Sequence, residues 1–329
     1  MLLKNIFILG DIGYFGKNLQ MVVNQVQKVI MPNDIVTILG DNFYPYGVSG
    51  KNDPLWNNYH EIFKDLSNPK YSILGNHDYL SNPTCQIRNE HWIMDDWYFK
   101  KEFQNIDLYF LDTNQFLIHD WVSEEKIEEV HQMDVTTLIY NQIDWLDNEM
   151  KKNKNKNKIV FGHYPLISNG VYKTKMEKLY DYLFECFKRN NVNLYISGHE
   201  HNIQFIKRDD DDFTFNQVII GSTSEYRHWE NNYCTEDDMF DSSDNFFGKL
   251  SIHYNFVIIE YFNKGGKLKY KYKVNWLNSL IKQLELSHID KLNTKELKKF
   301  NAQFFKKNQK KPHDYYVLMT LSCLFEEDF

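Results

Sequence analysis

The 329-residue sequence contains little cysteine, proline, glycine and arginine, and these shortages exclude several classes of protein. Its four widely spaced cysteines (Cys85, Cys186, Cys234, Cys323) include no CxxC pair, which excludes a zinc ribbon and a disulfide-dense scaffold. We expect free thiols, although the count also allows one disulfide. The 14 glycines and 7 prolines exclude a collagen-like chain. The longest apolar run, Val317–Phe325, is far shorter than the roughly 20 residues of a membrane helix, so we expect no membrane span.

Acidic residues slightly outnumber basic ones, with 45 Asp and Glu against 38 Lys and Arg and a net charge of −7. The sequence has no long basic stretch, so we expect no nucleic-acid partner. The apolar stretch Met1–Leu9 is too short for a signal peptide, and cleavage would remove Asp11, the first residue of a recurring motif. We therefore expect a cytosolic protein.

Short apolar runs recur along the first 200 residues, and each leads into a residue that can bind a metal, in most cases after a glycine. The runs are Ile6–Leu9, Ile35–Leu39, Tyr71–Leu74, Asp107–Leu111, Ile159–Phe161 and Leu194–Ser197. Continuous apolar runs of this length predict strands that are buried on both faces.

Amphipathic segments separate these runs and predict helices. They are Lys17–Ile30, Asn57–Leu66, Asn141–Lys152 and Lys175–Asn190. Alternation of strands and helices predicts a layered α/β fold, in which ligands bind beyond the carboxyl ends of the strands. The metal-capable residues all follow strands, so we expect one spatial cluster.

The pattern changes after Asp212. Strand-like runs at Val218–Ile220, Phe256–Tyr261 and Lys267–Val274 predict a second sheet, with a hairpin turn at Asn263–Gly266. From Trp276 onward the sequence is charged and helical in pattern. We therefore expect a main domain over residues 1–275 and a helical extension over residues 276–329.

The loops after the predicted strands carry oxygen and nitrogen ligands without sulfur. They are Asp11, Asp41, Tyr44, Asn76, His77, His163, His199 and His201. Such a set suits iron, manganese or zinc, and it is too large for one ion, which takes about four to six ligands. Two ions that share one carboxylate would fit the number of residues.

The motifs GDIG, GDNFY, GNHD, GHYP and GHEHN resemble those of the calcineurin-like metallophosphoesterases. More narrowly they resemble the purple acid phosphatases of the short, tartrate-resistant type, over residues 4–275. The resemblance implies a four-layer α/β/β/α sandwich. Gly13 stands where many of these enzymes have a histidine ligand, and Tyr44 supplies the phenolate that is typical of purple acid phosphatases.

The resemblance also implies a ligand assignment. The first ion would take Asp11, Asp41, Tyr44 and His201, and the second would take Asp41, Asn76, His163 and His199. Asp41 would bridge them. A phenolate favours Fe(III) at the first position, and the second would hold Fe(II), Zn(II) or Mn(II).

Other roles follow from the same resemblance. His77 would stabilise the transition state or the leaving group, Asp78 would orient His77 or cap the following segment, and Asn76 would also contact substrate. The family usually has a further histidine after the GHYP loop, but residues 164–198 contain none. Either Tyr172, Lys173 or Lys175 takes its place, or protonation of the leaving group falls on His77 alone.

These residues predict a phosphomonoester hydrolase in which metal-bound hydroxide attacks phosphorus in line, and we expect a monomer. One alternative is a phosphodiesterase or nucleotide hydrolase with the same site. Another is a scaffold that keeps the fold without turnover.

Overall fold

The computed structural model describes residues 2–116, 122–153, 156–173, 177–210, 213–229, 235 and 238–276. Lys175, Cys234, Cys323 and the helical extension expected after Trp276 lie outside the described residues, and the division into two domains stays a prediction. Cys85 and Cys186 are buried free thiols, as expected. Among the described residues, no helix combines the length and the hydrophobicity needed to cross a membrane.

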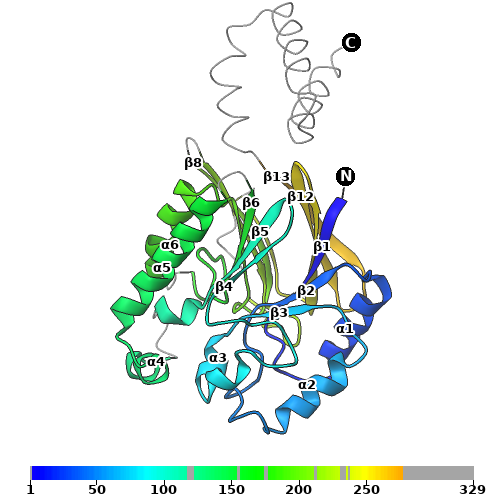
Figure 1. Cartoon of the computed structure of the whole chain (residues 1–329). Helices are drawn as coiled ribbons and strands as arrows, with labels where there is room; N and C mark the ends of the chain where they lie inside the picture. The colour runs from blue at the N-terminus through cyan, green and yellow to red at the C-terminus, as the bar shows by residue number, and fades with distance from the viewer. Residues whose placement is uncertain are drawn as a thin grey trace, which may run out of the picture. The chain divides into compact units, whose positions relative to one another are not determined.

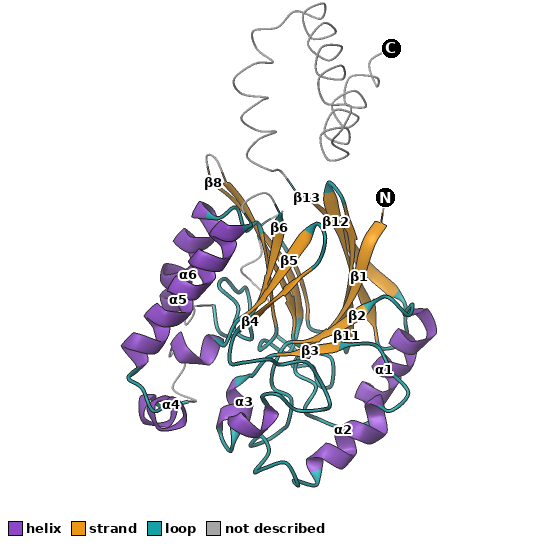
Figure 2. Ribbon diagram, in the orientation of Figure 1, coloured by secondary structure: helices purple, strands orange, loops and turns teal. Residues whose placement is uncertain are grey.

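Two β-sheets form the centre of the domain (Figure 2). The six-stranded sheet has the order β13 (Leu268–Asn275), β12 (Phe256–Asn263), β11 (Phe246–His253), β1 (Leu2–Leu9), β2 (Ile35–Ile38), β3 (Lys70–Ser72). The seven-stranded sheet has the order β10 (Met239–Asp241), β8 (Ile203–Asp210), β9 (Phe213–Ile220), β7 (Leu194–Ser197), β6 (Asn157–Phe161), β5 (Ile106–Phe110), β4 (Phe99–Glu102). In each sheet the strands that precede the metal-capable loops are parallel neighbours, so those loops leave from one edge.

The helices of the described residues lie outside the two sheets. They are α1 (Lys17–Val29), α2 (Leu55–Phe63), α3 (Asn76–Tyr79), α4 (Glu124–His131), α5 (Val135–Lys152) and α6 (Glu177–Arg189), with short 3₁₀ turns at Pro83–Gln86 and Thr113–Phe116. Figure 1 shows α1 on the side of the six-stranded sheet, and α5 and α6 on the side of the seven-stranded sheet. The expected α/β/β/α layering is confirmed.

Aromatic side chains join the inner faces of the sheets. Tyr71 of β3 stacks on Phe110 of β5 with ring centroids 5.5 Å apart, and Phe205 of β8 stacks on Tyr272 of β13 at 4.1 Å. The Tyr261 hydroxyl of β12 donates a hydrogen bond of 2.7 Å to the carbonyl of Gln204. Strands between these layers are buried on both faces; in β1 all four residues from Ile6 to Leu9 are fully buried.

The prediction that the later strands form a separate sheet is wrong. β9, which contains Val218–Ile220, pairs in parallel with β7, whereas β11, β12 and β13 extend the first sheet through antiparallel pairing of β11 with β1. Periodicity indicates a strand but not its partner, because the partner is set by tertiary packing. The expected hairpin is confirmed, since β12 and β13 pair around Asn263–Gly266.

The helix expected from Asn141 begins at Val135. Asp134 caps it by accepting a hydrogen bond of 2.9 Å from the backbone N–H of Thr137. The residues Val135–Thr137 are β-branched, which weakens helix propensity. The sequence pattern therefore did not predict this first turn.

Phe110 offers a test of the core. Its ring is fully buried and stacks on Phe99 at 4.6 Å and Phe161 at 5.0 Å. We expect Phe110→Ala to lower the free energy of unfolding by about 3–5 kcal/mol in urea titrations, because it removes buried surface and leaves a cavity. Tyr140→Ala on the exposed face of α5 is the control and should change it by less than about 0.5 kcal/mol. Equal losses would contradict this description of the core.

Candidate metal centre

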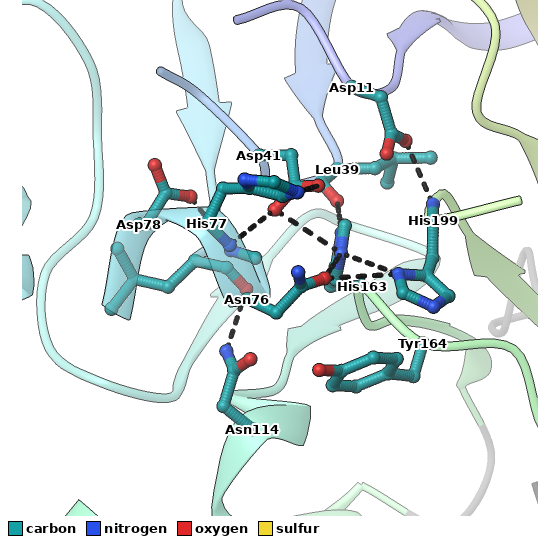
Figure 3. Close-up of polar contacts among 12 residues, drawn as sticks. Asp11, Leu39, Asp41, Asn76, His77, Asp78, Asn114, His163, Tyr164 and His199 are labelled. Atoms are coloured by element: carbon teal, nitrogen blue, oxygen red, sulfur yellow. Dashed lines mark hydrogen bonds and ion pairs between the residues drawn. The ribbon is translucent and has the colours of Figure 1, made fainter. Parts of the chain in front are cut away.

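The metal-capable side chains meet at the edge where the parallel strands of both sheets end (Figure 3). Asp11 follows β1, Asp41 and Tyr44 follow β2, Asn76 and His77 begin α3 after β3, His163 follows β6, and His199 and His201 follow β7. Every one of them is buried except His77, whose side chain is 15% exposed. The single cluster expected from the sequence is therefore present.

The carboxylate of Asp41 lies between two groups of side chains. Its Oδ2 accepts a hydrogen bond of 2.9 Å from the Tyr44 hydroxyl. Its Oδ1 accepts one of 2.9 Å from the backbone N–H of His77 and lies 3.5 Å from Nε2 of His163. One oxygen thus faces each group.

The first group contains Asp11, Tyr44 and His201. The Tyr44 hydroxyl lies 3.2 Å from Oδ1 of Asp11 and 3.0 Å from Nε2 of His201. His201 Nε2 is 3.8 Å from the same Asp11 oxygen. The other oxygen of Asp11 accepts a hydrogen bond of 2.8 Å from the backbone N–H of His199, which links the two groups.

The second group contains Asn76, His163 and His199. Oδ1 of Asn76 lies 3.0 Å from Nε2 of His163 and 3.1 Å from Nδ1 of His199. The two imidazole nitrogens are 3.3 Å apart. Three potential donors to one ion therefore converge within hydrogen-bond distance of one another.

The hydrogen bonds of His163 show that a cation fits here. Its Nδ1–H donates to the carbonyl of Leu39 at 2.8 Å, so Nε2 carries the lone pair. That lone pair faces acceptor oxygens of Asp41 and Asn76. Ligand atoms of Asp11, Asp41 and His163 all lie within 4.8 Å of one another. Acceptors facing acceptors in a buried site are stabilised by a positive ion between them, and the oxygen and nitrogen donors suit iron, manganese or zinc.

Burial disfavours the charged form of the ionisable groups at this site. It raises the pKa of the Asp11 carboxyl well above its usual value, and the negative charge of Asp41 raises it further. Burial also lowers the pKa of His163, and burial followed by the charge of Arg227 lowers that of His201 to about 3. A bound cation would favour both the ionised carboxylates and the neutral imidazoles.

Four of these residues adopt left-handed backbone conformations that are unusual for residues other than glycine. Asp11, Asp41, His199 and His201 have φ values of 57°, 50°, 70° and 49°. Such conformations cost roughly 1–2 kcal/mol per residue and concentrate at functional sites. Their clustering here is a second observation that indicates a built site.

His77 and Asp78 face different surroundings. The imidazole of His77 packs edge-on against Tyr44, with Nδ1 2.5 Å from the Pro45 carbonyl and Nε2 4.0 Å from Oδ2 of Asp41. The Asp78 carboxylate instead accepts hydrogen bonds from the backbone N–H groups of Gly75 and Asn42. Burial, reinforced by the charge of Asp41, raises the Asp78 pKa to about 7. Asp78 therefore joins the loops after β2 and β3.

Tyr172 lies beside the second group. Its ring is 4.5 Å from the imidazole of His199, and its backbone N–H donates a hydrogen bond of 3.3 Å to Oε1 of Glu200. Glu200 also accepts a hydrogen bond from the Ser168 hydroxyl, and it is buried. Sequence reasoning missed this role of Glu200, which fixes the loop after β6 to the loop after β7.

Arg227 was also missed. It lies in the loop after β9, and its backbone N–H donates a hydrogen bond of 3.0 Å to the carbonyl of His201. The sequence carried a signal, because the apolar run Val218–Ile220 leads into Gly221 in the same way that the other site strands lead into glycine.

Gly75 offers a test of the site. A Cβ atom at this position would lie 2.2 Å from both the backbone nitrogen and Oδ1 of Asp41. We expect Gly75→Ala to displace Asp41 and to weaken metal binding by about 10–100-fold, as changes next to metal ligands do. Metal content after dialysis against graded chelator measures this. A Cβ at Gly50 would meet no atom within 4 Å, so Gly50→Ala is the matched control. Equal metal retention by both variants would contradict the assignment.

Comparison with known proteins agrees with this geometry. The family model described as calcineurin-like phosphoesterase matches residues 4–202. Purple acid phosphatase 7 of Arabidopsis thaliana is 32% identical over 216 residues, which cover 60% of this chain and 64% of that protein. Tartrate-resistant acid phosphatase type 5 of Rattus norvegicus is 29% identical over 209 residues, covering 58% and 61%. The chain thus spans just under two thirds of the length of these relatives.

Two solved structures share the fold. GAP50, described as the anchor in the inner membrane complex of Plasmodium, has a TM-score of 0.67 at 23% identity and covers 84% of this chain and 90% of that one. A purple acid phosphatase from yellow lupin seeds has a TM-score of 0.61 at 14% identity and covers 83% and 53%. With the family model matching well over half of its residues, the chain belongs to the calcineurin-like phosphoesterase family.

Proposed function

We propose that this chain is a phosphomonoester hydrolase of the acid phosphatase type that uses two metal ions bridged by Asp41. The proposal rests on the position of the Asp41 carboxylate between the two donor groups. Its Oδ2 accepts a hydrogen bond from the Tyr44 hydroxyl, and its Oδ1 faces His163. Asp11, Tyr44 and His201 would complete one site, and Asn76, His163 and His199 the other. The similarity to purple acid phosphatases supports this function.

Tyr44 supports Fe(III) at the first site. Its hydroxyl is buried, and burial followed by the charges of Asp41 and Asp11 raises its pKa well above the usual value. Without a cation the phenol therefore keeps its proton. A ferric ion is acidic enough to favour the phenolate, whereas the second group, with one amide and two imidazoles, suits Fe(II), Zn(II) or Mn(II).

When bound, the two ions supply positive charge for the phosphate oxygens and lower the pKa of water so that it becomes the nucleophile. The protein positions a proton donor beside them. With Nδ1–H of His77 donated to the Pro45 carbonyl, Nε2 is directed to the side of Asp41. A proton at this nitrogen can pass to the leaving-group oxygen, and general-acid catalysis typically contributes about 10²–10⁴-fold.

Asp78 would act as a positioning residue. Its carboxylate accepts hydrogen bonds of 2.8 Å from the N–H of Gly75 and 3.1 Å from that of Asn42. These contacts hold the start of α3, which carries Asn76 and His77, against the loop of Asp41. In this way Asp78 would keep His77 in place without itself contacting the substrate.

Asp41→Asn tests the bridging carboxylate. On protein loaded with iron and zinc, we expect p-nitrophenyl phosphate hydrolysis between pH 4 and 8 to be fastest at acidic pH in the wild type. The variant should lose at least about 10²–10³-fold in kcat, because it removes the shared anionic ligand. Asp65→Asn, at an exposed position, is the control. Unchanged turnover in Asp41→Asn would exclude the two-metal mechanism.

Tyr44→Phe tests the ferric site by spectroscopy. A ferric phenolate gives a visible charge-transfer band, and we expect this band to disappear in the variant because the phenolate oxygen is absent. Tyr14→Phe is the matched control, since the ring of Tyr14 stacks on Tyr44 at 4.4 Å while Tyr14 itself is 42% exposed and is not one of the proposed ligands. A band that persists in Tyr44→Phe, or that disappears in Tyr14→Phe, would contradict the assignment of Tyr44.

Two alternatives remain as separate hypotheses, and the absence of histidine from residues 164–198 is the feature of the sequence that motivates them. A phosphodiesterase or nucleotide hydrolase would hydrolyse bis(p-nitrophenyl) phosphate faster than the monoester. A scaffold, comparable to GAP50 with its description as an anchor, would bind metal without turning over either substrate. The cytosolic location and the monomeric state stay predictions.

A further inference from the structure

The loop that follows β9 forms part of the wall of the metal site. The backbone N–H of Thr223 donates a hydrogen bond of 3.2 Å to the carbonyl of Gly10, and the Ser224 hydroxyl donates one to the carbonyl of Asp11. The backbone N–H of Arg227 donates to the carbonyl of His201. The loop is thus tied at both ends to residues of the first donor group.

The guanidinium of Arg227 lies next to a side chain that borders the second donor group. It forms a side-chain hydrogen bond with Tyr172, whose ring packs at 4.5 Å against His199. Burial is the largest influence on the pKa of Asp11 and of Tyr14 and raises both, whereas the charge of Arg227 lowers both. The charge of Arg227 thus acts on Asp11 and His201 of the first donor group, and the contact with Tyr172 brings it close to His199 of the second.

The charge of Arg227 is available to a ligand. Within the described part of the chain, no carboxylate forms an ion pair with its guanidinium. Glu225, an acidic residue of the same loop, has Oε2 3.8 Å from Nδ1 of His201 instead, and its side chain is 45% exposed. Arg227 itself is exposed. An exposed arginine that has no carboxylate partner among the described residues, next to a candidate metal site, indicates a site for an anion.

We propose that Arg227 binds the phosphate group of the substrate, with Tyr172 orienting its guanidinium; this inference rests on the proposed phosphomonoesterase function. A guanidinium presents paired N–H donors that match two oxygens of one phosphate, and such charge-assisted bonds are strong and directional. A cation from the loop after β9 would take the place of the histidine that residues 164–198 lack. The preferred substrate is then a dianionic monoester.

Arg227→Gln tests the proposal in the metal-loaded, full-length protein. We expect the KM for p-nitrophenyl phosphate and the inhibition constant of inorganic phosphate each to rise roughly 10–100-fold, the effect of losing one charge-assisted hydrogen bond. Metal content and the visible band should stay unchanged, because Arg227 contacts no metal through its side chain. The KM and the phosphate inhibition constant of Arg227→Lys should fall between those of the wild type and Arg227→Gln, since an ammonium keeps the charge but not the paired donors.

Two further variants separate this role from a structural one. Arg88→Gln is the matched control: Arg88 is 73% exposed, pairs with Asp96 at 3.3 Å, and should stay within about twofold of wild type. Tyr172→Phe keeps the ring against His199 and removes the hydroxyl, so it alone should raise the KM about 3–10-fold. Added to Arg227→Gln, it should raise the KM little further, because the effects of coupled residues are not additive.

Several outcomes would overturn the inference. Unchanged KM and phosphate inhibition in Arg227→Gln would do so, as would a loss of bound metal large enough to account for the defect. If the wild type shows no turnover, the hydrolase proposal fails, and calorimetric titration with inorganic phosphate decides about Arg227. Weaker phosphate binding by Arg227→Gln than by wild type would then support the inference, and equal or absent binding in both would refute it.

Discussion

The burial of two carboxylates at one edge of the molecule is the constraint on which the rest of the site depends. Asp11 and Asp41 are almost inaccessible to solvent, and removing a carboxylate from water costs several kcal/mol unless it is compensated. The protein compensates part of this cost with N–H and O–H donors, among them the backbone of His199 and of His77. Oδ1 of Asp41 also faces the imidazole lone pair of His163, at 3.5 Å from Nε2. A cation is the group that satisfies both, so metal binding and local stability depend on each other.

Close approach of the loops explains why glycines lie next to these carboxylates. A Cβ at Gly75 would lie 2.2 Å from Oδ1 of Asp41, and one at Gly198 would lie 2.4 Å from Oδ2 of Asp11. Glycine is therefore required where one loop crosses the carboxylate of another. The left-handed backbone of Asp41 and His199 then directs their side chains inward, at a cost in conformational energy. Such strain persists where the surrounding structure and a bound ligand offset it.

The cluster of metal-capable side chains could be predicted from sequence because a local rule places its members. Each follows a buried parallel strand, and the carboxyl ends of such strands share an edge. The pairing of β11 with β1 could not be predicted, since the residues of a strand do not specify which strand it pairs with. Glu200 and Arg227 were missed for a related reason. Their roles come from contacts with Ser168, Tyr172 and the His201 carbonyl, across loops whose relative positions only the folded sheets define.

The site therefore lies at the seam between the sheets, and its geometry depends on their packing. The six-stranded sheet supplies Asp11, Asp41 and Asn76, and the seven-stranded sheet supplies the three histidines. Hydrogen bonds of 2.8 Å from His163 to the Leu39 carbonyl and from the His199 N–H to Asp11 cross the seam. The loop of Arg227 crosses it as well, through the Gly10 carbonyl. Ions bound at this seam would bind only the packed form and would therefore stabilise the sheet interface by linkage. The same packing would align the proposed metal ligands with Arg227, the proposed phosphate-binding cation.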